Sequence, residues 1–236
     1  MNYDGGWRPR VAFERDFPPF TYVDQGVAAG AALDIIRVAF AAVRVECQFV
    51  PAVMRDRRLL MRRGEVDAWA LLSVSKERSL DLYFSEPYLS TGAGIFYRRG
   101  ESGRQAQGGV TSRIVTPANG PLRQEILGHF PQAELCLAES YEACLRTVIE
   151  DRADAAALNI DVGAMLAERL YPGKFDLPTH PFLATPVAVG ACRPSGQSVI
   201  ELFNEGLRIA APEVGKLPSV RKLRSHACPA EVQGED

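Results

Sequence analysis

The chain has 236 residues, of which 47% are hydrophobic and 24% are charged, and its formal net charge is −2. This is the composition of a globular protein, and the length suits one large domain or two lobes of ordinary size. The balanced charge offers no basic surface for phosphates, so no nucleic acid is expected as a partner, and no apolar run approaches the roughly 20 residues of a membrane helix.

The N-terminal segment MNYDGGWRPR lacks the basic-then-apolar layout of a signal peptide. The protein is therefore either cytoplasmic or has had a signal peptide removed. Five cysteines are scattered without a CxxC pair, and the three histidines share no metal-ligand spacing with them. We expect no bound metal and no cofactor, and the odd number of cysteines leaves at least one unpaired.

The first third of the chain alternates strands and helices. RVAFE (Arg10–Glu14) predicts a strand that ends at the breaker RDFPPF, and apolar positions at helical spacing begin at Ala31. VECQFV predicts a second strand, the segment through Leu59 and Leu60 a helix ending at Gly64, and VDAWALL a third strand. The basic segment MRDRRLLMRR is most simply the solvated face of that helix. This order predicts a parallel sheet with helices on both faces.

A second α/β unit follows the polar, glycine-rich interval at residues 98–109. RIVTP, AELCLA and ADAAAL predict strands, and PLRQEIL begins a helix. Helical spacing recurs in Tyr141–Ile149, in residues 162–170 and, after the strand PVAVGACR, in residues 199–210. The segments GEVDA and DRADA each link a helix to a strand, and this weak echo suggests two similarly built lobes.

Several residues come directly after predicted strands and have no evident role in the hydrophobic core. Phe17 follows the first strand, Ser73 the third, and Asn119, Gly120 and Asn159 follow strands of the second unit. In open parallel sheets, small molecules bind beyond the carboxyl ends of the strands. We therefore expect a ligand site at these strand ends.

Five segments resemble the type II periplasmic solute-binding proteins of the polar amino-acid class, that is, bacterial extracellular solute-binding proteins of family 3. They are FPPF, the helix start Gly30–Asp34, RRGEVDA, SVSKERSLDLYFSEPYL and RADAAALN. The resemblance covers about Arg10 to Arg224, and the spacing S-x-x-x-x-R…FSxPY is its most specific part. It implies the α/β two-lobe periplasmic-binding-protein type II fold, in which each lobe is a mostly parallel sheet flanked by helices and the ligand cleft lies between the lobes.

The resemblance also implies where the chain passes from lobe to lobe. Lobe 1 is expected to comprise residues 1–97 and 194–236, and lobe 2 residues 98–193. The two crossover strands would lie near Ile95–Arg98 and Val187–Arg193.

The same resemblance assigns roles to individual residues. The arginine that matches, Arg78, would hold the carboxylate of the ligand with help from the Ser73 hydroxyl, because the parallel donors of a guanidinium match both carboxylate oxygens. Phe17 would stack over the ligand. From the residues alone, Arg78 could instead pair with Glu77 or Asp81, and Phe17 could belong to the core. No residue is expected to be catalytic, and the other expected ligand-binding residues are Leu71, Asn119, Gly120, Pro121 and Asn159.

Three positions depart from the family pattern. Pro121 stands where the second lobe usually presents Ser or Thr, so the hydroxyl donors are lost while the helix amides remain. Asn159 stands where amino-acid binders commonly place an aspartate on the α-ammonium group. The segment that carries Leu71 is one residue shorter than in the commonest members, which affects how this residue aligns. Binding of the carboxylate is thus retained and binding of the ammonium group weakened, so the expected ligand is an amino acid, a modified amino acid or a carboxylate without the amine.

We expect a monomeric, non-enzymatic solute-binding protein that captures a small carboxylate by hinge closure for an ABC-type transporter or receptor. The resemblance places it in the periplasm or outside the cell, with its signal peptide removed. A competing hypothesis is an enzyme resembling cyclohexadienyl dehydratase, with Glu14, Asp16 or Asp161 as acid or base. The sequence is also compatible with a sensor input domain, and with a lobe pair that binds a protein and no small molecule.

Overall fold

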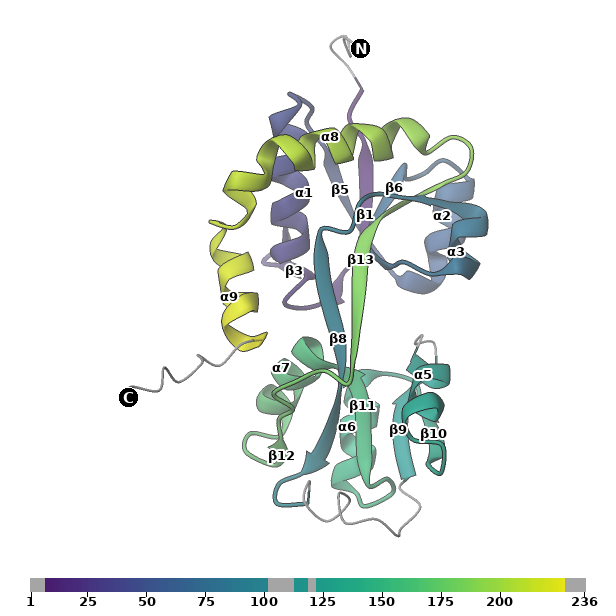
Figure 1. Cartoon of the computed structure of the whole chain (residues 1–236), viewed down its shortest axis with the longest axis vertical. Coiled ribbons are helices and arrows are strands. Elements are labelled where there is room, and N and C mark those ends of the chain that lie inside the picture. The colour runs from purple at the N-terminus through teal and green to yellow at the C-terminus, as the bar shows by residue number, and fades with distance from the viewer. Residues whose placement is uncertain (1–6, 102–112, 119–121, 228–236) are drawn as a thin grey trace, which may run out of the picture. The chain divides into compact units, whose positions relative to one another are not determined.

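The computed structural model describes residues 7–101, 113–118 and 122–227 (Figure 1). The chain divides into two compact units. Unit 1 contains Met1–Ser90 and Thr185–Ser225, and the main part of unit 2 is Thr91–Ala184.

Two long strands carry the chain between the units, namely β8 (Leu89–Arg98) and β13 (Leu183–Cys192). Each of them belongs partly to unit 1 and partly to unit 2, so the unit limits fall earlier in these strands than the expected lobe limits at residues 97 and 193.

The main sheet of unit 1 has the order β5-β1-β6-β13, with β7 paired to β13. As predicted, β1 runs parallel to both of its neighbours, whereas β13 runs antiparallel to β6 and β7. A small antiparallel sheet, β2-β3-β4, follows β1 and was not predicted. The strands of unit 1 besides β13 are β1 (Arg10–Glu14), β2 (Asp16–Phe17), β3 (Thr21–Asp24), β4 (Val27–Ala29), β5 (Gln48–Ala52), β6 (Ala68–Ser73) and β7 (Leu82–Phe84).

Close packing of two helices forms much of the core of unit 1. A Cβ added at Gly206 of α8 would lie 2.7 Å from the carbonyl carbon of Ala39 in α1 and closer still to its oxygen, so only glycine allows this approach. The Phe40 and Phe203 rings meet beside it, with centroids 5.8 Å apart. The helices of unit 1 are α1 (Ala31–Ala42), the 3-10 turn η1 (Met54–Asp56), α2 (Arg57–Arg62), α3 (Lys76–Asp81), α8 (Gln197–Val214) and α9 (Pro218–Ala227).

The sheet of unit 2 has the order β10-β9-β11-β8, with β12 paired to β8. The strands β10, β9 and β11 are parallel, as the sequence predicted, and β8 is antiparallel to β11. The α/β class and the helix-flanked sheet are thereby confirmed. The elements of unit 2 besides β8 are β9 (Arg113–Pro117), α5 (Leu122–His129), β10 (Glu134–Ala138), α6 (Tyr141–Ile149), β11 (Ala155–Asn159), α7 (Ile160–Leu170) and β12 (Phe175–Asp176).

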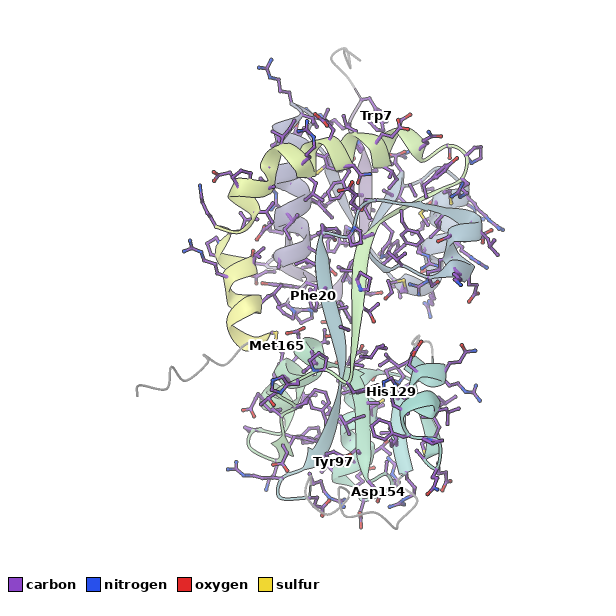
Figure 2. The ribbon with its side chains drawn as sticks, viewed as in Figure 1. Trp7, Phe20, Tyr97, His129, Asp154 and Met165 are labelled. Carbon is purple, nitrogen blue, oxygen red and sulfur yellow. The ribbon has the colours of Figure 1, made fainter. Side chains whose placement is uncertain are left out.

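The echo between GEVDA and DRADA is a repeated structural junction. In unit 1 the Asp67 carboxylate accepts the backbone N–H of Arg10 at 2.7 Å and its guanidinium Nη2 at 2.9 Å. In unit 2 the Asp154 carboxylate, labelled in Figure 2, accepts the same two groups of Arg113 at 2.7 and 3.0 Å. Each aspartate therefore ties the start of one strand to the start of its parallel neighbour.

The contacts with Arg113 also determine the pKa of Asp154. Burial raises the pKa of its carboxyl, but the hydrogen bonds and the charge of Arg113 lower it by more, so the pKa lies below the ordinary value of 3.8.

Candidate functional site

The segment from Ser73 to Arg78 is a strand end followed by a short helix. The Ser75 side chain caps α3, because its Oγ accepts the backbone N–H of Arg78 at 3.2 Å. Ser73 ends β6 and is half-buried, and its hydroxyl has no hydrogen-bond partner within the described residues. The cap places Arg78 in the first turn of the helix, directly beyond the carboxyl end of the strand.

The Arg78 guanidinium is partly withdrawn from water and has no acidic partner within the described residues. Its Nη1 donates to the Ser73 carbonyl oxygen at 2.9 Å. Burial lowers its pKa, which the charge of Glu77 opposes, but an arginine remains protonated regardless. Asp81, one of the two carboxylates considered as its surface partner, pairs with Arg58 at 2.8 Å instead. In the described part of the chain Arg78 thus keeps donors free for an anion.

A second arginine, Arg57, lies close to Arg78. It begins α2, and its Nε is buried without a hydrogen-bond partner among the described residues. Burial is the main cause that lowers its pKa, and the positive charges of Arg78 and Arg58 lower it further. Its Nη1 reaches only the Met54 sulfur, at 3.7 Å. The interpretation of MRDRRLLMRR as a solvated face is therefore wrong for Arg57.

The expected aromatic residue is anchored in unit 1. Phe17 is half-buried in β2, and its ring stacks on that of Phe20 with centroids 6.0 Å apart and planes 27° apart. Phe20 is 1% exposed and belongs to the core. Leu71 is 8% exposed on β6. The ligand contacts expected of Phe17 and Leu71 stay predictions.

In unit 2, Asn159 is the only one of the four expected site residues that the structure describes, because Asn119, Gly120 and Pro121 lie outside the described residues. Their expected roles stay predictions.

The Asn159 side chain caps α7. Its Oδ1 accepts the backbone N–H groups of Asp161 and Val162, each at 3.1 Å, and its Nδ2 donates to the Thr91 hydroxyl. The two backbone donors identify the oxygen, since the opposite orientation would set N–H against N–H. Both lone pairs of Oδ1 are used, and the other terminal atom is a donor. The residue therefore offers no acceptor to an ammonium group.

Of the candidate acids, Glu14 is the one whose carboxyl the structure perturbs most clearly. Burial raises its pKa, while hydrogen bonds from the backbone N–H groups of Met54 and Arg15 lower it in part. The Met54 N–H bond is 2.7 Å long. Asp16 is exposed, and Asp161 is engaged within the protein.

No three His, Cys, Asp or Glu side chains in the described part of the chain form a group that could hold a metal ion. The four cysteines that are described, Cys47, Cys136, Cys144 and Cys192, are unpaired. Among residues 7–101, 113–118 and 122–227, none of the helices has the length and apolar character needed to span a bilayer.

Comparison with solved structures shows the fold. The periplasmic VFT2 domain of BvgS from Bordetella pertussis superposes with a TM-score of 0.78 at 20% identity, covering 91% of this chain and 92% of that one. A histidine kinase sensor domain with similarity to periplasmic binding proteins gives 0.76 at 19% identity, covering 92% and 95%. An ancestral amino acid-binding protein, a precursor of cyclohexadienyl dehydratase, gives 0.72 at 19% identity, covering 92% and 93%.

Among curated proteins, no sequence matches the chain significantly. The sequence profile of the bacterial extracellular solute-binding proteins, family 3, matches residues 10–212. That range spans most of both units, and it includes the strand end, the capped helix and Arg78 described above. The chain therefore belongs to the bacterial extracellular solute-binding proteins of family 3.

Proposed function

We propose that the protein binds a small organic acid and that Arg78 holds the acid by its carboxylate. The observation that carries this proposal is a half-buried guanidinium that has no protein carboxylate as a partner within the described residues. A desolvated cation without a counter-ion is costly, so a fold retains one where a ligand supplies the missing charge. Membership of a solute-binding family supports a small ligand.

We also propose that the ligand lacks an α-ammonium group. Asn159 is the residue expected to contact that group, and its only side-chain oxygen already accepts two backbone N–H groups. Its remaining N–H can only donate, and an ammonium group needs an acceptor. A carboxylate without the amine, such as a 2-oxo or 2-hydroxy acid, avoids this mismatch.

We propose that the protein is a monomer and that it acts outside the cytoplasm; the description of its family as extracellular supports the location. Closure of its lobes on the acid would create the form that a partner recognises. That partner is an ABC-type permease or a signalling receptor. The similar structures include a histidine kinase sensor domain as well as an ancestral amino acid-binding protein, and the same binding step serves either partner.

A dehydratase-like activity is the second candidate, and the environment of Glu14 favours it. Burial raises the pKa of this carboxyl, so it holds its proton to a higher pH than an exposed glutamate, as a general acid must. One of the similar structures is a precursor of cyclohexadienyl dehydratase. Mass spectrometry after incubation with a cyclic prephenate-like acid tests this candidate. Product formation that disappears in Glu14→Gln would establish it, and no product would eliminate it.

A thermal-shift screen of matched acids tests the main proposal. Each α-amino acid is compared with the deaminated acid of the same carbon skeleton. A ligand at a hundredfold excess over its Kd raises the free energy of unfolding by about 2.7 kcal/mol, so binding is easily seen. We expect the deaminated acids to raise the Tm and Arg78→Ala to abolish this rise. Arg58→Ala removes the same charge from the neighbouring helix and serves as the control.

Asn159→Asp tests the ligand class with a gain of function. The carboxylate keeps one oxygen for the helix cap and presents a second, charged oxygen in place of Nδ2. We expect this variant to respond more strongly to α-amino acids than the wild type does. The proposal is contradicted if no acid stabilises the wild type, or if Arg78→Ala responds to the acids as the wild type does.

A further inference from the structure

The positive charge of Arg57 is not neutralised by an acidic side chain within the described residues, where its guanidinium contacts only the Met54 sulfur. Its helix α2 and the helix α3 of Arg78, both labelled in Figure 1, are tied together by the ion pair between Arg58 and Asp81 at 2.8 Å. The two helices follow β5 and β6, which both pair with β1, so their first turns lie at the same edge of the sheet. Arg57 and Arg78 are the arginines that this arrangement brings together.

No acidic group of unit 1 compensates the pair in the part of the chain that the structure describes. Asp81 is taken by Arg58, and Glu77, whose charge acts on Arg78, forms no ion pair with it. The Cys192 thiol also lies near Arg57, but burial raises its pKa, which keeps it neutral. The buried Nε of Arg57 is left without any hydrogen-bond partner there.

An unpaired buried donor on a cation, next to a second cation, is unfavourable in the free protein. The structure offers two guanidinium edges: the terminal Nη1–Nη2 edge of Arg57, whose Nε is buried, and the edge of Arg78 beyond the Nη1 that contacts Ser73. Each edge matches one carboxylate, with parallel donors for its two oxygens.

We propose that Arg57 is a second anion-binding residue beside Arg78 and that the ligand is a dicarboxylic acid, with one carboxylate on each guanidinium. This inference rests on the proposed function and names its ligand class. It assigns to Arg57 the preference for a dianion over a monoanion, whereas Arg78 is needed for either acid.

Isothermal titration calorimetry with acids that differ only in charge tests the assignment. Succinate is compared with succinamate, and glutarate with glutaramate, so that an amide replaces one carboxylate at nearly constant size. We expect the wild type to bind each dicarboxylate about tenfold or more tightly than its monoamide, which is the scale of one charge-assisted hydrogen bond.

Substitutions of Arg57 separate its role from simple loss of charge. In Arg57→Gln the two acids of a pair should bind with similar affinity, and the affinity for the monoamide should change little. Arg57→Lys keeps the charge without the planar fork and should retain part of the preference. Arg62→Gln removes an equal charge from an exposed position of the same helix, leaves the Arg58–Asp81 pair intact, and should preserve the preference in full. Far-UV circular dichroism of each variant confirms that it is folded.

The outcomes distinguish this inference from the proposed function. Equal affinity of the wild type for both acids of each pair overturns the dicarboxylate assignment and leaves acid binding by Arg78 in place. An unchanged preference in Arg57→Gln overturns the role of Arg57. Tighter binding of 3-phosphonopropionate than of succinate overturns the choice of carboxylate as the second group. A wild type that binds neither acid overturns both proposals.

Discussion

Replacing Arg57 with methionine should make the ligand-free protein more stable, although most substitutions destabilise. The buried Nε has no partner in the described part of the chain, and one such unsatisfied donor costs about 1–3 kcal/mol. Methionine keeps an unbranched apolar chain along the same path and loses little packing, about 1 kcal/mol or less. We therefore expect a net gain of about 1 kcal/mol in the free energy of unfolding, with relief of the repulsion from Arg78 adding to it.

Arg58→Met provides the matched control, because it removes the same charge from the next position. The side chains of the Arg58–Asp81 pair are 58% and 46% exposed. A pair this exposed contributes about 0–1 kcal/mol, so its loss should be neutral or slightly destabilising. Of the two neighbouring substitutions, only Arg57→Met is thus expected to raise the free energy of unfolding.

Urea unfolding without ligand measures both effects. The chain has two tryptophans, Trp7 and Trp69, and both belong to unit 1, so their fluorescence reports on the unit that carries Arg57. Adding a saturating dicarboxylate should reverse the order, because Arg57→Met loses part of the ligand's stabilisation. The reasoning is refuted if Arg57→Met lowers the free energy of unfolding by as much as Arg58→Met or more.

Three further predictions concern stability and reactivity. Gly206→Ala should destabilise by about 1–3 kcal/mol because its Cβ meets the backbone of Ala39, whereas Gly215→Ala, which meets nothing within 4 Å, should be neutral or stabilising; urea unfolding decides between these signs. Asp154 contributes stability that is present above its ordinary pKa of 3.8 and is lost as the pH falls through its lowered folded pKa. The stability difference between wild type and Asp154→Asn should therefore shrink at acid pH, and a constant difference would contradict this. Burial, with some help from a nearby charge, raises the pKa of Cys144 to about 12, so peptide mass spectrometry should show slow alkylation by iodoacetamide in the native protein, and rapid labelling would refute it.

Elements with a clear hydrophobic period were predictable. The strand Arg10–Glu14 was predicted with the observed limits, and so was the helix Tyr141–Ile149. The strand expected from VECQFV begins later, at Gln48. The sheet β2-β3-β4 and the six-residue helix α3 were missed, because strands of two to four residues and helices of fewer than two turns show no reliable period.

The candidate site was predictable to the extent that it lies in one continuous motif. Ser73 and Arg78 were identified from the resemblance of their segment to the family motif, and the structure brings them into contact through the Ser73 carbonyl oxygen. The role of Ser75 as a helix cap became evident only with the helix itself. Arg57 was assigned to a solvated helix face, because the sequence of α2 does not show which of its several arginines is buried.

The sequence by itself determined the α/β class, the family, and which chemical groups occupy the expected ligand positions, including an amide at Asn159 where the resemblance led us to expect a carboxylate. These properties depend on local pattern and on side-chain identity. Only the tertiary structure decided that the Asn159 oxygen is fully used by a helix cap, and that Arg57 and Arg78 share one positive region that the described residues do not compensate. Residues far apart in the sequence become neighbours when parallel strands bring the loops beyond them to one edge of the sheet, and whether a charge is neutralised depends on those neighbours.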